Sequence, residues 1–262
     1  MALNRSSSRI VIVIRSVAAI AASGAVKPAA GQLTRPQSGH FNLATTIKNV
    51  DNVDYVKYTS HPPGGQRSHL LSHDSRVDPD KIMLMGFSRG GQATLYAAMT
   101  RLNRLWNTSG VRFRAYLPFY PDCMTRYRDD TDVNGPIREF HGADDDYDPA
   151  PACAAYFERL QQAGRDATMT VFPHASHAFD MPYAMPTVVV KGAQTVRACR
   201  IVENESGELV NEATGAPFSF HDDCVQTDPH VGGNAQARDA AIADVIAYLK
   251  TVLGGGGDAL GD

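Results

Sequence analysis

The sequence predicts an α/β fold with a mainly parallel sheet and helices on both faces. From residue 81 onward, short apolar or alternating runs typical of strands alternate with segments of helical character. Strands that alternate with helices are joined by crossovers, which pair the strands in parallel and cover both faces of the sheet. The predicted strands are residues 82–85, 111–117, 136–142 and 167–173, and the predicted helices are residues 92–99, 149–163 and 234–253.

Apolar spacing supports the two later helices. In the helix at 149–163, Ala154, Phe157 and Leu160 share one face, and Gly164 is a typical helix stop. The last helix is predicted to turn an apolar face inward. That face consists of Ala240, Ile242, Val245, Ile246, Leu249 and Val252.

Length and composition are those of a globular protein. The chain has 262 residues, of which 43% are hydrophobic and 20% charged, enough for one sizeable α/β domain or two small ones. The formal net charge is −3 and no basic block occurs, so nothing indicates nucleic-acid binding. No run of eighteen apolar residues occurs, so no membrane span is expected.

Four segments describe the organisation that we expect. Residues 1–30 are either a secretory signal or a disordered segment, and residues 31–67 are a diverged or truncated amino-terminal part with one predicted hairpin between Asn42 and Lys57. Residues 68–253 form the core, within which the polar residues 181–231 are an excursion packed on the domain. The glycine-rich residues 254–262 are expected to be a disordered tail.

The first thirty residues have several features of an export signal. Arg5 and Arg9 precede the apolar run from Ile10 to Ile14, and small residues follow. Arg15 interrupts the apolar core and counts against this interpretation. We expect a periplasmic or secreted protein, with a cytoplasmic location as the alternative.

The four cysteines favour the same compartment. None belongs to a Cys-x-x-Cys pair, so zinc is not indicated. An even number of cysteines is compatible with two disulfides in an oxidising compartment. We predict the pairs Cys123–Cys153, which follow successive strands, and Cys199–Cys224, which flank a polar segment. Four buried free thiols are the alternative.

The turn between the first regular strand and its helix carries a candidate nucleophile. Residues 86–90 are Gly-Phe-Ser-Arg-Gly, a Gly-x-Ser-x-Gly motif placed between a strand and a helix, as a nucleophile elbow requires. Such a turn exposes the Ser88 hydroxyl and points the backbone N–H of Arg89 at the place where an oxyanion would form. The alternative is a glycine-rich turn with a serine helix cap.

A serine nucleophile needs a base and an acid that orients the base. The acid is expected at the carboxyl end of a later strand, where loops converge. After the strand at 136–142 come Asp144, Asp145 and Asp146, of which Asp145 is favoured, three residues after Gly142 and four before Pro149. Asp144 and Asp146 remain open. A solvated acidic turn at a helix N-terminus is the other interpretation.

The base is expected after the next strand. His174 and His177 follow residues 167–173. His177 is favoured because the apolar pair Ala178 and Phe179 could anchor a loop that projects it. A surface histidine without a role is the alternative.

Together these motifs resemble the dienelactone hydrolase family of α/β-hydrolases. The resemblance covers roughly residues 68–253 and depends on Gly-Phe-Ser-Arg-Gly-Gly at 86–91, His-Gly-Ala-Asp-Asp at 141–145 and His-Ala-Ser-His-Ala-Phe-Asp at 174–180. It implies an α/β-hydrolase fold with Ser88 as nucleophile, Asp145 as acid and His177 as base. The dienelactone hydrolases of this family use cysteine as nucleophile. Because position 88 holds serine, the chain resembles the esterase-like branch of the family.

The resemblance implies a serine hydrolase of small-molecule carboxylic esters, lactones or thioesters that needs no metal or cofactor. One departure concerns the amino-terminal half, which is interpreted as incomplete. No apolar strand ending in a His-Gly-x-Gly-Gly-like loop, the family's second oxyanion donor, is identified before Ser88, and residues 61–65 contain prolines that lack the N–H. A catalytically weak or inactive binding protein is therefore the alternative hypothesis. The oligomeric state stays open.

Overall fold

The computed structural model describes residues 11–16, 46–50, 53–58, 78–107, 110–181 and 185–254 of the 262. Several predictions concern residues outside this set. They are the small-residue part of the candidate signal, the proline-containing loop at 61–65 and the glycine-rich tail from residue 255 onward.

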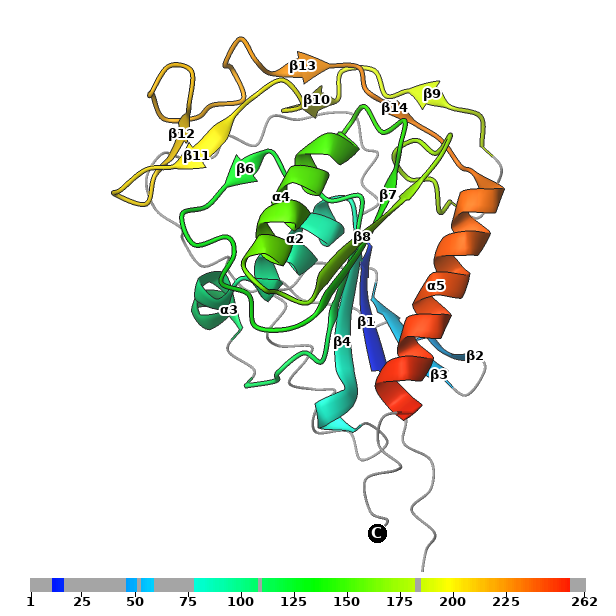
Figure 1. The fold of residues 1–262 in the computed structure, drawn as a ribbon. Coiled ribbons are helices and arrows are strands. Elements are labelled where there is room, and N and C mark those ends of the chain that lie inside the picture. Colours follow the sequence, from blue (N-terminus) through cyan, green and yellow to red (C-terminus); the bar gives the residue numbers. More distant parts are fainter. Residues whose placement is uncertain are drawn as a thin grey trace, which may run out of the picture.

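A seven-stranded sheet forms the centre of the molecule (Figure 1). The strands lie in the order β2-β3-β1-β4-β5-β7-β8, and every neighbouring pair is parallel except β2 with β3. The fold class predicted from the sequence is therefore confirmed. The strands are β1 (Val11–Ser16), β2 (Thr46–Val50), β3 (Val53–Tyr58), β4 (Ile82–Phe87), β5 (Tyr116–Phe119), β7 (Ile137–Gly142) and β8 (Ala167–Phe172).

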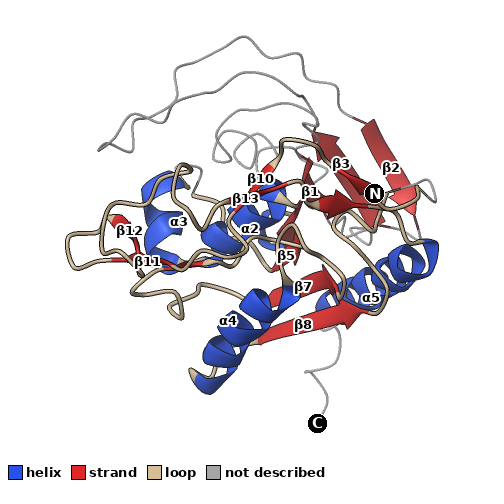
Figure 2. Cartoon of the chain, turned by 90° about the horizontal axis from the view of Figure 1, so that it is seen from above, coloured by secondary structure: helices blue, strands red, loops and turns tan. Residues whose placement is uncertain are grey.

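Helices cover both faces of this sheet, as seen from above in Figure 2. Three of them lie on one face and the fourth on the other, where it closes the chain's regular structure (Figures 1 and 2). The first three are α2 (Arg89–Ala98), α3 (Thr100–Trp106) and α4 (Ala150–Gln162), and the fourth is α5 (Ala235–Gly254). A short 3-10 helix, Pro79–Lys81, leads into β4.

The side chains of β4 point alternately into two core layers, one on each face of the sheet. Met83 and Met85 pack in the layer that α5 covers, and Ile82 packs in the layer that α2, α3 and α4 cover. Successive strand residues point to opposite faces, so a strand covered on both sides is apolar throughout. This explains why Ile82 to Met85 is an unbroken apolar run.

Two predicted details of the regular region differ from the structure. β5 begins only at Tyr116 instead of residue 111, although Arg114 N–H already donates to Ile82 O at 2.7 Å. The inward face of α5 is also shifted, because Ala240 and Ile242 are exposed. The buried residues of α5 recur every four positions and are Ala237, Ala241, Val245 and Leu249.

The amino-terminal residues form part of the sheet. The apolar run interpreted as a signal core supplies β1, which lies beside β4 with Ser16 paired to Phe87. An apolar strand that the sequence analysis did not identify before Ser88 is therefore present, while the residues that follow it lie outside the described ranges. Removal of this segment would delete a central strand. The isolated apolar run carries no motif that distinguishes a strand from a signal. The predicted hairpin is confirmed, since β2 and β3 pair with Thr46 opposite Lys57.

The polar excursion forms small sheets above the carboxyl ends of the central strands, along the top of Figure 1. β11 (Ile201–Glu203) pairs with both β12 (Leu209–Asn211) and β6 (Thr125–Arg126), so the excursion is joined to the core by a ladder. The other strands form two short antiparallel pairs. They are β9 (Val188–Val189) with β14 (His230–Val231), and β10 (Gln194–Thr195) with β13 (Gln226–Thr227).

Both predicted disulfides are present. Cys199–Cys224 closes the excursion, and Cys123–Cys153 joins the loop after β5 to α4. The alternative of four free thiols is therefore excluded for this structure, in which the cysteines are all paired.

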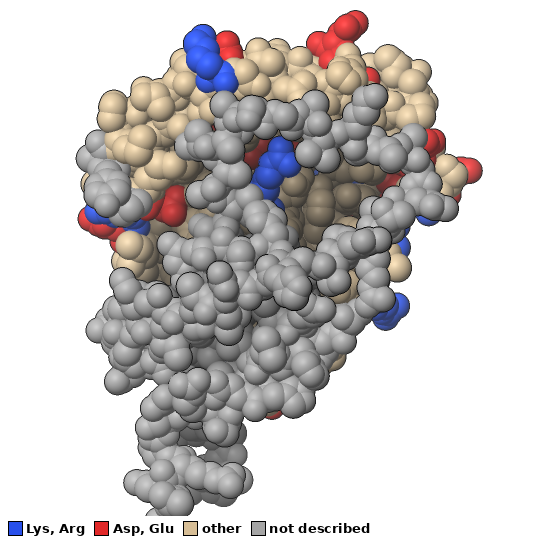
Figure 3. Space-filling view, turned by 180° about the vertical axis from the view of Figure 1, so that it is seen from behind, with Lys and Arg blue, Asp and Glu red and all other residues tan. Residues whose placement is uncertain are grey.

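Surface charge and helix character of the described residues concern the partners expected from the sequence. Figure 3 shows one face, on which charged side chains of both signs among the described residues lie mostly around the margin, some of them with opposite signs side by side. No helix within the described ranges combines the length and apolar character required to cross a bilayer.

Candidate active site

The turn between β4 and α2 holds Ser88 in a strained backbone conformation. Its φ is 54° and its ψ is −121°, a region that non-glycine residues rarely adopt. The neighbouring glycines are required by space, because a Cβ on Gly86 would lie 2.0 Å from Gly90 O and one on Gly91 would lie 2.4 Å from Phe119 O. The Ser88 N–H donates to Phe119 O at 3.0 Å. This is the elbow that the motif predicted.

The turn after β7 aims the Asp145 carboxylate. Its Oδ1 accepts hydrogen bonds from the backbone N–H groups of Tyr147 and Asp148, both at 2.9 Å. A Cβ on Gly142 would lie only 2.2 Å from Ala175 O, so this turn packs tightly against the loop that follows β8. With Oδ1 held by the backbone, Oδ2 is directed at that loop.

The loop after β8 presents His177. Phe179 is fully buried in the core and anchors the loop, as its apolar character predicted. Ala178 has a φ of 64°, which turns the chain sharply between the anchor and the histidine. The His177 carbonyl accepts from Gly232 N–H at 3.0 Å, so the residue that follows the excursion also holds the loop.

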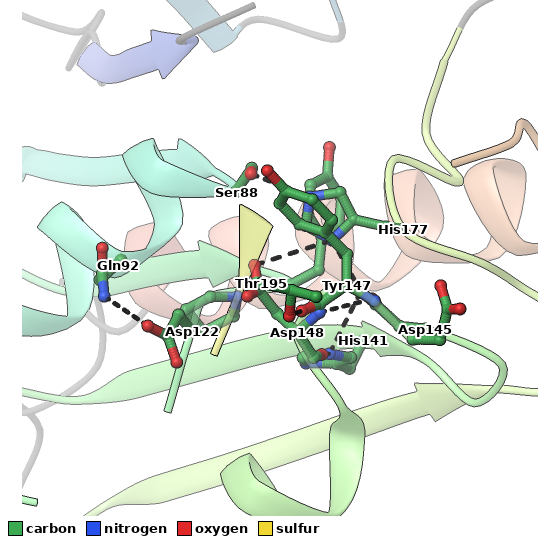
Figure 4. A network of polar contacts seen from close by, with 12 residues as sticks. Ser88, Gln92, Asp122, His141, Asp145, Tyr147, Asp148, His177 and Thr195 are labelled. Atoms are coloured by element: carbon green, nitrogen blue, oxygen red, sulfur yellow. Dashed lines mark hydrogen bonds and ion pairs between the residues drawn. The ribbon is translucent and has the colours of Figure 1, made fainter. Parts of the chain in front are cut away.

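The three side chains meet in a continuous chain of hydrogen bonds (Figure 4). Ser88 Oγ lies 2.8 Å from His177 Nε2, and His177 Nδ1 lies 2.8 Å from Asp145 Oδ2. Three different strand ends, those of β4, β7 and β8, supply these residues. Residues 88, 145 and 177 are thus the ones that the structure brings together.

The alternative site residues lie elsewhere. Asp144 and His174 are exposed, the histidine side chain to 91%, and their nearest charged atoms are 4.0 Å apart. Asp146 instead accepts from Arg197 Nη1 and His230 Nδ1, both at 2.9 Å, and so ties the excursion to the acid turn. Neither aspartate contacts His177 among the hydrogen bonds of the described residues.

The electrostatics of the site favour an ionised acid. Burial would raise the pKa of Asp145, but His177 and His141 together lower it to about 2. Burial would lower the pKa of His177, but the Asp145 carboxylate outweighs this and raises it. Asp148, whose Oδ2 lies 3.8 Å from His177 Nδ1, has its pKa raised to about 8, mainly by burial. An imidazole beside an ionised carboxylate can take a proton from a hydroxyl.

Two tyrosines that the sequence did not suggest enclose the His177 ring. The ring centroids of Tyr120 and Tyr147 each lie 4.7 Å from that of His177. Tyr120 has a φ of 35°, and its hydroxyl donates to the Asp180 carboxylate. Both tyrosines lie in loops without periodic apolar pattern, so no sequence signal marks them.

The amino end of α2 lies next to Ser88. The first N–H groups of a helix have no acceptor within the helix, and the helix dipole adds positive charge there. The Arg89 N–H is the first of these in α2. This N–H is the group that the elbow motif is expected to point at an oxyanion.

One group of metal-ligand atoms occurs behind the site. Atoms of Glu139, His141 and Cys153 lie within 4.8 Å of one another, all buried. The Cys153 sulfur is in a disulfide, and Glu139 and His141 bind each other. These atoms are therefore already engaged, and the residues do not fit a resident metal ion.

The order of the strands and the turn between β4 and α2 are those of an α/β-hydrolase fold. The sequence model of the dienelactone hydrolase family matches residues 65–205, more than half of the chain. The chain belongs to the dienelactone hydrolase family.

A curated protein is similar to part of this chain. Acyl-protein thioesterase 1 of Gibberella zeae is 30% identical over 107 residues, which are 40% of this chain and 44% of that protein. The chain thus spans less than half the length of this curated relative.

Among solved structures, a dienelactone hydrolase-like promiscuous phosphotriesterase from metagenomic libraries is 16% identical, covering 71% of this chain and 58% of its own, with a TM-score of 0.44. An α/β-hydrolase enzyme from a Medee basin deep-sea metagenome library is 15% identical. The match covers 77% of this chain and 71% of that protein, with a TM-score of 0.43.

Proposed function

We propose that this protein is a serine hydrolase of carboxylic esters, lactones or thioesters that uses Ser88, His177 and Asp145. The observation that supports this most directly is the unbroken hydrogen-bond chain from Asp145 Oδ2 through both nitrogens of His177 to Ser88 Oγ. Family membership and the thioesterase name of the Gibberella relative agree with an ester-type substrate.

In the proposed mechanism, the acyl group is transferred first to Ser88 and then to water. His177 Nε2 accepts the hydroxyl proton as Ser88 Oγ attacks the carbonyl carbon, and the Arg89 N–H donates to the oxyanion. The protonated His177 gives that proton to the leaving alkoxide or thiolate. A water molecule then attacks the acyl-enzyme and gives a proton to His177. The acid is released, and His177 returns the proton to the Ser88 oxygen.

The Asp145 carboxylate has an orienting role in this mechanism. Its contact with Nδ1 places the proton there in the resting state, which leaves the Nε2 lone pair facing Ser88. It also stabilises the imidazolium that forms in both steps. Because the pKa of Asp145 is lowered to about 2, the carboxylate carries this charge at neutral pH.

A fluorophosphonate probe tests the nucleophile. We expect the wild type to be labelled on Ser88 and the Ser88→Ala variant to remain unlabelled. A folded wild type that is not labelled at Ser88 would support the inactive binding protein instead. A panel of p-nitrophenyl esters and acyl-thioesters of graded chain length then identifies the acyl group.

We also propose that the protein works in the periplasm or outside the cell, because its two disulfides are typical of an oxidising compartment. The use of residues 11–16 as β1 argues against their removal as a signal. Amino-terminal sequencing of the exported protein, together with its mass with and without reductant, tests both points.

A further inference from the structure

A second histidine–carboxylate pair lies directly behind Asp145. His141 and Glu139, both on β7, have side chains that are 0% exposed. His141 Nδ1 lies 2.6 Å from Glu139 Oε1, and His141 Nε2 lies 2.6 Å from the carbonyl oxygen of Asp148. Both ring nitrogens of His141 therefore face oxygen atoms.

These contacts fix how many protons the pair holds. A carbonyl oxygen can only accept, so Nε2 of His141 must carry a hydrogen. The 2.6 Å contact on the other side also needs a hydrogen, which lies between Nδ1 and the Glu139 carboxylate. The pair thus holds one proton more than a neutral imidazole beside a carboxylate.

The same imidazole also faces the acid of the site. His141 Nε2 lies 3.5 Å from Asp145 Oδ2, the atom that accepts from His177 Nδ1 at 2.8 Å. Since Asp145 Oδ1 accepts from two backbone N–H groups, the carboxylate is surrounded by donors. A carboxylate in this position is held both in orientation and in charge.

We propose that His141, kept protonated by Glu139, is a positioning residue that holds the Asp145 carboxylate ionised and limits the proton affinity of His177. This rests on the proposed function for its kinetic consequence, but its electrostatic consequence stands without it. The charged or titratable groups that face this arrangement are Glu139 on β7, Asp145 and Asp148 in the acid turn, and His177 in the loop after β8.

Two observations support a role beyond stability. Glu139 Oε2 has no hydrogen-bond partner among the described residues, so its carboxyl group is devoted to His141. Buried ion pairs generally add little stability compared with apolar residues of the same volume. Burial alone would lower the pKa of His141, but Glu139 and Asp145 raise it to about 10, and its charge in turn lowers the pKa of His177.

The test uses Glu139→Gln in the full-length protein with ¹⁵N-labelled histidine. Glutamine can donate to His141 Nδ1, so the hydrogen bonds persist while the extra proton is lost. In the wild type we expect both nitrogens of His141 to stay protonated from about pH 5 to 9. In Glu139→Gln we expect one protonated nitrogen on His141, and a His177 pKa raised by about 0.5 unit.

The same upward shift is expected in the acid limb of kcat/KM with a p-nitrophenyl ester. A neutral His141 in the wild type at pH 7, or an unchanged His177 pKa in Glu139→Gln, would overturn the proposal. The protonation state of His141 in the wild type tests the proposal even if Glu139→Gln does not fold.

A control is Asp130→Asn, which disrupts another, partly buried ion pair, with Arg159 Nη2 at 2.6 Å. It is expected to lower Tm without moving the His177 titration. The same titration in Ser88→Ala is read without any turnover. Absence of hydrolysis by the folded wild type would therefore count against the proposed function. Only histidine spectra that differ from those expected would count against this inference.

Discussion

The two buried histidine–carboxylate pairs, Asp145–His177 and Glu139–His141, have similar geometry but different chemical capacity. Their nitrogen–oxygen distances are 2.8 Å and 2.6 Å. The difference lies in the second nitrogen, which faces the Ser88 hydroxyl in one pair and a backbone carbonyl in the other. A hydroxyl can give up a proton and a carbonyl cannot, so only His177 is placed to act as a base.

The largest difference between the pairs should appear when each histidine is replaced. We expect His177→Gln to lower kcat by about 10⁴-fold or more while the protein stays folded, because the base is lost. We expect His141→Gln to lower kcat by about 10²-fold at most, since it only displaces the acid, and to lower Tm because a buried pair is broken. Steady-state kinetics and thermal unfolding of both variants measure this, and equal kinetic losses would remove the distinction.

Replacing neighbouring aspartates sharpens the comparison within the acid turn. Asp145→Asn should lower kcat by about 10³- to 10⁴-fold, because an amide no longer fixes the His177 tautomer. Asp146→Asn is the matched control, since Asp146 binds Arg197 and His230, and should keep activity within about tenfold of the wild type. A larger loss of kcat in Asp146→Asn than in Asp145→Asn would show that Asp145 is not the acid.

The pH dependence follows from the raised pKa of His177. The base must be neutral, so kcat/KM should rise with pH, with a midpoint above about 6.5, the ordinary value for histidine. The pKa of the Asp148 carboxyl is raised to about 8, and once ionised this group raises the pKa of His177 further. Asp148→Asn should therefore move the acid limb to lower pH, opposite to Glu139→Gln. A shift in the same direction as Glu139→Gln would contradict this electrostatic account.

The smallest expected effect concerns the excursion. Removing the Cys199–Cys224 disulfide with two alanines opens a loop with a sequence separation of 25 residues, which should cost about 3 kcal/mol of unfolding free energy. The triad geometry should persist, because Asp145 and His177 are held by the core turns, so kcat should change by about tenfold or less. Thermal unfolding and kinetics of Cys199→Ala/Cys224→Ala measure both. A kinetic loss as large as that of Asp145→Asn would show that the excursion builds the site.

The sequence predicted the candidate site better than its surroundings. Ser88, Asp145 and His177 are each marked by a local pattern at the end of a strand, and the topology of a parallel sheet brings such ends together. The choice between Asp145 and its two neighbours needed the turn geometry, in which Oδ1 binds the backbone and Oδ2 remains for His177.

Features that depend on tertiary pairing could not be predicted. β1 is a six-residue strand whose assignment comes only from its ladders with β3 and β4, and its apolar run is equally typical of a signal. His141 was visible as part of a motif, but its bond to Glu139 depends on two same-side residues of one strand closing on each other. Tyr120 and Tyr147 lie in irregular loops and meet His177 only in the folded chain.

The most direct test of the account is the capture of the acyl group on the protein. Wild type mixed with a p-nitrophenyl ester and quenched in acid within the first turnover should carry one acyl group, which peptide mapping by mass spectrometry should locate on Ser88. Ser88→Ala should carry none. Hydrolysis by folded wild type with the acyl group on another residue, or equal hydrolysis by Ser88→Ala, would contradict the account.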